Sequence, residues 1–198
     1  MNRELYEKIT DALVKKGYIV IENALDPPLA KRLHVYAQSL SELKQAGISA
    51  TNSQHIDSTK RCDKTQWLEE DSAVQSEFLA FTSELQTYLN RALYLGLNNY
   101  ESHFAIYEKD DFYETHLDAF KNSKNRVITT VYYLNDGWNR EDGGALKVYT
   151  EEKEFLTEVT PLANTLVIFL SEKFPHEVLV TNKTRYSIAG WFRVDGNG

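Results

Sequence analysis

Hydrophobic positions in the first part of the chain recur with the period of an α-helix. Leu5, Ile9 and Leu13 stand four residues apart, which places them on one face of a helix that Gly17 ends. Asp26-Pro27-Pro28 predicts the start of a second helix, with the aspartate as its cap and proline in its first turn. The apolar face of this second helix comprises Leu29, Leu33 and Tyr36.

A third and longer helix is predicted between residues 74 and 95. Its apolar positions alternate by four and three residues, the spacing of an amphipathic helix that packs one face on a large surface. Residues 45–70, which precede it, are polar and follow no sustained period, so we expect a long loop there. The apolar positions of the third helix are Val74, Phe78, Phe81, Leu85, Tyr88, Ala92 and Leu95.

From residue 100 onward the pattern changes to short runs of β-branched and aromatic residues, separated by turn signals at 135–137 and 142–144. Many short strands favour a sandwich or barrel. We therefore predict an α+β fold in which helices back one sheet of a double-sheeted barrel. The predicted strands are 102–107, 127–134, 145–149, 155–160, 165–170, 176–180 and 185–194.

Length and composition favour one domain over 1–198, with helical support and a substrate loop in 1–95 and the barrel core in 100–194. The net charge of −7, with no basic cluster longer than Lys15–Lys16, argues against a nucleic-acid partner. Cys62 is the one cysteine, which excludes an intrachain disulfide and fits a reducing compartment. The N-terminus lacks an apolar signal core, and the longest apolar run, 166–170, is too short to span a bilayer. We expect a soluble, cytoplasmic protein without a membrane partner.

The candidate chemistry begins with His116-Leu117-Asp118 and the much later His176. Side chains two apart on a strand point to one face, so His116 and Asp118 are able to grip the same ion. A third ligand from a distant strand completes two histidines and one carboxylate, the arrangement of non-haem iron(II) oxygenases. Histidine and aspartate two apart also occur by chance, and His34, His55 and His103 have no comparable pattern; on a predicted strand, His103 is expected to be structural.

Arg185 strengthens the prediction of a metal site. Residues 185, 187, 189 and 191 share one face of a strand, which sends Arg185, Ser187 and Trp191 into the barrel. A buried guanidinium requires an anionic partner, and the distal carboxylate of 2-oxoglutarate would supply one. The alternative without a binding role is that Arg185 is an exposed arginine at a strand edge.

These motifs together resemble the prolyl-hydroxylase branch of the 2-oxoglutarate oxygenases. The residues that carry the resemblance are His-x-Asp at 116–118, Pro175-His176-Glu177-Val178, Arg185-Tyr186-Ser187-Ile188 and Trp191. Val131-Tyr132-Tyr133-Leu134-Asn135, Trp138 and Gly143-Gly144-Ala145-Leu146 are similar to a stretch of the animal oxygen-sensing prolyl hydroxylases and their bacterial relatives. Arg61-Cys62-Asp63-Lys64 with Trp67 resembles an Arg-Gly-Asp-Lys loop of that subgroup, although cysteine replaces the glycine.

The resemblance implies a double-stranded β-helix, a jelly-roll of the cupin-like kind, and a role for each matching residue. His116, Asp118 and His176 would hold Fe(II), and Arg185 with Tyr133 would bind the far carboxylate of 2-oxoglutarate. Tyr107 would lie near the chelating end of the cosubstrate, Trp191 would wall the pocket, with Ser187 beside it, and Tyr113 would stand at its entrance. Asp63 and Arg126 would form an ion pair that ties the loop to the barrel. Apart from the resemblance, a large aromatic residue such as Trp67 in a polar, aperiodic loop favours a lid that selects the substrate, and packing of Trp67 against the barrel is the alternative.

The implied reaction uses O2 and 2-oxoglutarate to hydroxylate a prolyl residue of a protein, with release of succinate and CO2 and with ascorbate in support. Among bacterial relatives, translation elongation factor Tu is the partner to test first. Hydroxylation of a free amino acid or another small molecule is one alternative, and a non-catalytic 2-oxoglutarate or metal sensor is another. A zinc hydrolase would not need Arg185, and a halogenase would lack the carboxylate of Asp118.

Overall fold

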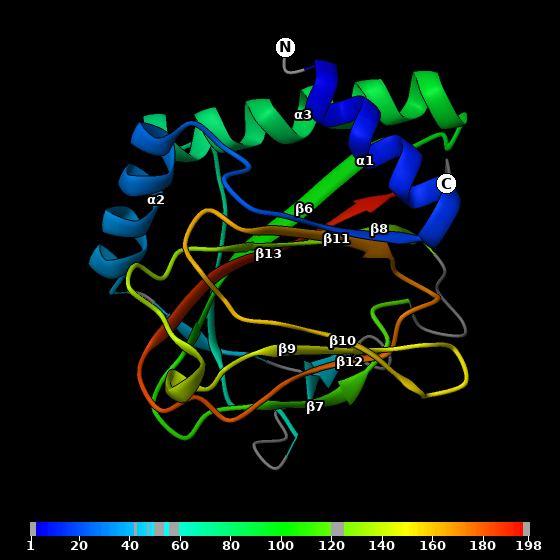
Figure 1. The fold of residues 1–198 in the computed structure, drawn as a ribbon. Coiled ribbons are helices and arrows are strands. Elements are labelled where there is room, and N and C mark those ends of the chain that lie inside the picture. The colour runs from blue at the N-terminus through cyan, green and yellow to red at the C-terminus, as the bar shows by residue number, and fades with distance from the viewer. Residues whose placement is uncertain are drawn as a thin grey trace.

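The computed structural model describes residues 3–41, 43–46, 48–49, 54–55, 60–119 and 125–195, with the backbone alone at 48–49 and 54–55. Two antiparallel sheets lie face to face, and the helices pack on the outer side of the larger sheet (Figure 1). The chain crosses repeatedly from one sheet to the other, so the barrel is a jelly-roll, which confirms the predicted α+β fold class.

The larger sheet has seven strands in the order β1-β11-β8-β13-β6-β5-β2, and the smaller has four in the order β10-β9-β12-β7. The strands of the larger sheet are β1 Tyr18–Ile21, β11 Leu166–Leu170, β8 Arg126–Tyr133, β13 Arg185–Arg193, β6 Asn99–Tyr107, β5 Lys64–Trp67 and β2 Lys44–Gln45. Those of the smaller sheet are β10 Phe155–Val159, β9 Leu146–Tyr149, β12 His176–Val178 and β7 Tyr113–His116. A separate hairpin consists of β3 Ile48–Ser49 and β4 Gln54–His55.

Three helices form where the apolar periodicity predicts them: α1 Arg3–Lys16, α2 Pro27–Ser39 and α3 Ala73–Leu93. Gly17 ends α1 at a positive φ of 78°, which glycine adopts without strain. Asp26 precedes α2, but its side chain accepts no hydrogen bond from the helix backbone. The first two helical residues are prolines, which have no backbone N–H. Instead Ser72 caps α3 by accepting a hydrogen bond from the Gln75 N–H. Among the described helices, none combines the length and the apolar character needed to cross a membrane.

The two faces of the larger sheet serve different purposes. On β8, Tyr132 packs toward the helices with Phe78 and Leu85 of α3, whereas its neighbours Val131 and Tyr133 face the smaller sheet. This alternation follows from the period of two in a strand. The outer face therefore carries the main apolar core, and the inner face is free to carry the polar groups of a site.

The prediction of an unstructured loop at 45–70 is wrong for part of that segment. β5 pairs with β6 in the larger sheet, from Lys64↔Ile106 to Trp67↔His103, and β2 pairs with β5 in turn. Strands this short and this polar carry too little periodicity to be recognised locally, and the long strand β6 supplies the pairing that orders them. Residues 47, 50–53 and 56–59 of the predicted lid lie outside the described residues.

Candidate metal and cosubstrate site

A cavity of about 550 Å³ opens between the two sheets. Its walls include the predicted metal ligands His116, Asp118 and His176, and also Arg185. Further predicted site residues on its walls are Tyr107, Tyr113, Ser187, Trp191, Trp67 and Arg126. Tyr133 and Asp63 are not on the cavity wall; both are fully buried beside it.

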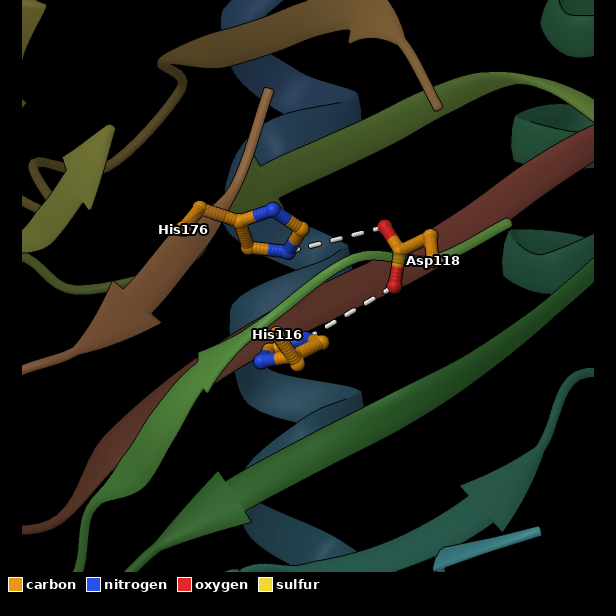
Figure 2. A group of neighbouring side chains, drawn as sticks. All are labelled: His116, Asp118 and His176. Carbon is orange, nitrogen blue, oxygen red and sulfur yellow. Dashed lines mark ion pairs between the residues drawn. The ribbon is translucent and has the colours of Figure 1, made fainter. Parts of the chain in front are cut away.

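The three predicted metal ligands converge on one point, although they come from separate segments (Figure 2). His116 is the last residue of β7 and His176 the first of β12, and these two residues face each other in the ladder between the strands. The Asp118 carboxylate lies 3.6 Å from Nε2 of His116 and 3.5 Å from Nε2 of His176. All three ligand atoms lie within 4.8 Å of one another.

The position of Asp118 in the backbone differs from the one that the sequence predicted. β7 ends at His116, so Asp118 lies in the bend that follows the strand and not on the strand itself. Its Oδ2 accepts a hydrogen bond of 2.8 Å from the Thr129 hydroxyl on β8. The carboxylate is thus aimed by a contact to the opposite sheet, and strand alternation is not the cause of its orientation.

Hydrogen bonds to the backbone fix both imidazoles in the state that a metal needs. Nδ1 of His116 lies 2.8 Å from the Glu114 carbonyl oxygen, and Nδ1 of His176 lies 2.9 Å from that of Phe174. A carbonyl oxygen only accepts, so each Nδ1 carries the proton and each Nε2 presents a lone pair to the centre. Two neutral nitrogens and one carboxylate are the ligand set of non-haem iron(II) sites with open positions.

Electrostatics keep the triad in that state. Burial lowers the pKa of His116, and the adjacent His176 lowers it further, so the imidazole stays neutral. Burial by itself raises the pKa of Asp118, but His176 and His116 outweigh it, and the pKa lies below its ordinary value. The Asp118 carboxylate is therefore anionic beside the neutral imidazole of His116 near pH 7.

A cationic pocket lies in the same cavity. Arg185 is only 1% exposed; its Nε donates to the Gly144 carbonyl oxygen and its Nη1 donates to the Ser187 hydroxyl. Apart from a contact with the Tyr133 hydroxyl, the remaining guanidinium N–H groups have no acceptor among the described residues, and no described carboxylate pairs with Arg185. The Tyr133 hydroxyl is likewise buried without a well-formed hydrogen bond to a described residue, and its ring lies 5.1 Å from the guanidinium carbon. A buried cation next to an unpartnered hydroxyl fits an incoming carboxylate.

Glycine is required where the backbone approaches this arginine. Gly144 has a φ of 64°, and a Cβ atom at this position would lie 2.9 Å from Cδ of Arg185. The Gly143-Gly144 pair thus allows the carbonyl of residue 144 to reach the guanidinium.

Two tyrosines lie beside the charged and metal-binding groups of the site, Tyr107 next to Arg185 and Tyr113 next to His116. The Tyr107 ring lies 4.9 Å from the guanidinium carbon of Arg185, and its predicted contact with the chelating end of the cosubstrate stays a prediction. Tyr113 stacks on His116 with ring centroids 3.6 Å apart, and Arg61 covers its ring at 4.7 Å. Tyr113 therefore supports a predicted metal ligand directly.

Comparison with known proteins identifies the family. The model of the 2OG-Fe(II) oxygenase superfamily matches residues 102–193. The crystal structure of a prolyl-4-hydroxylase from Pseudomonas putida is 33% identical in sequence, with a TM-score of 0.87, over 96% of this chain and 100% of that one. This chain belongs to the prolyl hydroxylase family. It is therefore a dioxygenase dependent on iron(II) and 2-oxoglutarate, as the sequence predicted.

Two further relatives are animal proteins. Prolyl hydroxylase EGLN3 of Mus musculus is 29% identical over 94% of this chain and 82% of its own length. A prolyl hydroxylase in complex with a hypoxia inducible factor peptide fragment, from Trichoplax adhaerens, has a TM-score of 0.83. It is 23% identical over 97% of this chain and 90% of its own, so it shows the shared fold.

The ion pair predicted between Asp63 and Arg126 of this prolyl hydroxylase is wrong. Asp63 is fully buried and accepts two hydrogen bonds from Arg61, of 2.6 and 3.0 Å. Arg126 instead donates to Glu101 at 2.7 and 2.9 Å and covers the Trp191 ring at 3.7 Å. Each charge finds a partner nearby, Asp63 two residues away and Arg126 on the same sheet, which sequence alone does not reveal.

The sequence did not predict the roles of three residues that shape the site of this hydroxylase. Thr129 aims Asp118, Arg61 covers Tyr113, and His103 lines the cavity although it was expected to be structural. Only Arg61 had a possible signal, because it stands in the motif at 61–64. Thr129 and His103 depend on which face of a strand turns inward, and that is set by tertiary packing.

Proposed function

We propose that this hydroxylase holds iron(II) through His116, Asp118 and His176 and acts on a prolyl residue in a protein. The observation that carries the assignment is the buried Arg185 with its unpaired N–H groups, in the same cavity as a triad of neutral nitrogens and a carboxylate. A ligand with a carboxylate at one end and a chelating group at the other, lying between Arg185 and the triad, would account for both.

The chain's own side chains perform binding and orientation. Nε2 of His116, Nε2 of His176 and the Asp118 carboxylate would hold the iron, while Arg185 and Tyr133 would bind the distal carboxylate of 2-oxoglutarate. When bound, the iron supplies the oxidative chemistry, in which 2-oxoglutarate and O2 give succinate, CO2 and a hydroxylated product. The inner walls, with Leu146 and Val178, exclude bulk water from this region.

A protein substrate is favoured by the mouth of the cavity. Trp67 on β5 is 48% exposed and lines the opening, which leaves a large aromatic surface for a bound chain. A relative of the same fold is known in complex with a peptide fragment. Elongation factor Tu, the partner indicated by the sequence resemblance, is the first candidate, and a free amino acid such as proline is the alternative.

The metal and cosubstrate assignment is tested by succinate formation with iron(II), 2-oxoglutarate and ascorbate. His176→Ala should reduce turnover by more than about 100-fold, since even partners of metal ligands contribute about 10–100-fold. His34→Ala is the matched control, because His34 lies on α2 outside the cavity wall. Full turnover in His176→Ala would contradict the iron assignment, and binding of 2-oxoglutarate without any succinate would identify a sensor.

Arg185 is tested by the requirement for the cosubstrate. Arg185→Ala should raise the KM for 2-oxoglutarate strongly, because the distal carboxylate would lose its charge partner in a desolvated site. An unchanged KM would place the carboxylate elsewhere.

The substrate is tested by mass spectrometry. Purified elongation factor Tu, a cell lysate and free L-proline are incubated separately with the enzyme, and new hydroxyproline is sought in each. Modification of free proline alone would replace the proposed protein substrate by a small molecule.

A further inference from the structure

A histidine that is not one of the predicted metal ligands lies among aromatic side chains on the cavity wall. His103 lies on β6, is 4% exposed and lines the cavity. The Trp67 ring meets it edge-on at a centroid distance of 5.3 Å, and the Trp191 ring lies 5.4 Å from it. Arg126 covers the Trp191 ring in turn. The row Trp67, His103, Trp191 and Arg126 thus crosses four neighbouring strands of the larger sheet.

One ring nitrogen of His103 is committed, and the other is available to a ligand. Nδ1 lies 3.2 Å from the Phe104 carbonyl oxygen, which only accepts, so Nδ1 carries the proton. Nε2 is then a pure acceptor, and none of the described residues donates to it. Burial lowers the pKa of His103 to about 4, and the positive charge of Arg61 contributes, so the ring is neutral near pH 7.

Packing alone does not account for an imidazole here. A polar ring buried between two indoles loses hydration, which a side chain such as leucine would avoid. The loss is offset only if Nε2 gains a donor, and a ligand in the cavity that His103 lines would supply one.

We propose that His103 is a specificity-determining residue whose Nε2 accepts a hydrogen bond from a backbone N–H beside the target proline. The inference rests on the proposed protein substrate. A prolyl residue within a chain has no N–H of its own, so the donor belongs to a flanking residue of a peptide that lies across Trp67 and Trp191. A ring with a fixed acceptor selects an exposed backbone amide at that position and disfavours a carbonyl.

Replacement of His103 separates this role from packing. Gln places an amide oxygen near the position of Nε2, whereas Asn places its amide near Nδ1 and Leu has no acceptor. In assays with a library of short synthetic peptides centred on proline, KM is measured for the peptide that wild type hydroxylates fastest. His103→Leu and His103→Asn should raise this KM about fivefold to tenfold, the factor for one lost neutral hydrogen bond, and His103→Gln should restore most of it. His34→Leu, the same change outside the cavity wall, is the matched control and should leave KM as in wild type.

Methylated peptides identify the donor. The flanking amides are N-methylated one at a time. At one position, methylation should raise the KM of wild type by the same factor and should not raise the KM of His103→Leu further. Equal KM values in wild type and His103→Leu, or a 15N NMR spectrum of the imidazole with the proton on Nε2, would overturn the inference alone. If wild type hydroxylates no peptide, the protein substrate and this inference both fail, while succinate formation without peptide would still support the iron and cosubstrate sites.

Discussion

At the scale of single residues, contacts outside the cavity decide what each polar group offers inside it. Backbone carbonyls hold the triad histidines in one tautomer, and the same device orients His103. The Gly144 carbonyl and the Ser187 hydroxyl hold Arg185 in place by two hydrogen bonds. Each functional group is thus arranged before any ligand binds, which reduces the cost of ordering it later.

Thr129 provides a test of this arrangement. Thr129→Val keeps the shape of the side chain but removes the hydrogen bond to Asp118, and also the contact of 2.9 Å with the Ser171 hydroxyl. The Kd for iron(II), measured by anaerobic calorimetry in the presence of 2-oxoglutarate, should rise by about 10–100-fold. Thr130→Val is the matched control, because the Thr130 hydroxyl bonds to Tyr100 and to the Gly190 carbonyl oxygen. An equal rise of this Kd in Thr129→Val and Thr130→Val would mean that Thr129 acts through the stability of the fold.

Tyr133 offers a second test at this scale. Burial raises the pKa of Tyr133 to about 12, so its hydroxyl keeps the proton and donates near pH 7. Tyr133→Phe should raise the KM for 2-oxoglutarate about threefold to tenfold, the value of one hydrogen bond. Tyr132→Phe on the other face of β8 removes a hydrogen bond to Asn164 and should lower stability with no change in that KM. A cosubstrate KM that is unchanged in Tyr133→Phe would remove this residue from the binding site.

At the scale of elements, the site is assembled from strands that are distant in sequence and adjacent in space. β13 pairs with β6 on one side and with β8 on the other, which brings Arg185, Tyr107 and Tyr133 together. β7 and β12 of the smaller sheet contribute the two histidines. A strand within a sheet holds its side chains more rigidly than a loop, as a site with defined geometry requires.

β5 is the element that connects the cavity mouth to the barrel. Thr65 faces Lys44 of β2 on one side and Ala105 of β6 on the other, so proline at this position removes a ladder hydrogen bond. Thr65→Pro should lower the free energy of unfolding by about 1–3 kcal/mol and displace Trp67. Hydroxylation of a prolyl peptide should then fall more than succinate formation in the absence of peptide. Thr65→Val keeps the backbone N–H and is the control; an equal loss of both activities in Thr65→Pro would assign β5 a purely structural role.

At the scale of the whole molecule, stability and chemistry occupy opposite sides of the larger sheet. The helices and the outer face form an apolar core that includes Phe78, Leu85, Leu89 and Phe192. The inner face carries buried polar groups such as Arg185, His103 and Thr129, whose desolvation opposes folding unless each is paired. The burial of the apolar core on the outer face offsets the desolvation of the polar groups on the inner face.

His103 makes this balance dependent on pH. Its pKa is about 4 in the folded protein, mainly because of burial, against an ordinary value of 6.5. As the pH falls through 6.5 the unfolded chain takes up a proton that the folded chain refuses, so stability decreases until about pH 4. The full effect is up to about 3 kcal/mol.

Urea unfolding near neutral pH and near pH 4.5 measures this pH dependence of stability. The loss of stability between these conditions should be smaller in His103→Gln than in wild type, since glutamine does not titrate. Parallel losses in both proteins would show that His103 is not the group responsible.

The sequence by itself determined the helices, most strands and the residue types of the metal site. Periodicity fixed α1 and α3, since an apolar stripe every three or four residues has one stable solution against a sheet. The motifs around His116, His176 and Arg185 survive in the linear chain because each is a local pattern. Tertiary structure alone decided the rest. It ordered β5 against β6, turned Asp118 toward Thr129, paired Asp63 with Arg61 and Arg126 with Glu101, and placed His103 on the cavity wall. Except for the local Asp63–Arg61 pair, these outcomes depend on long-range pairing and on the face that each strand turns inward, which short polar segments do not encode.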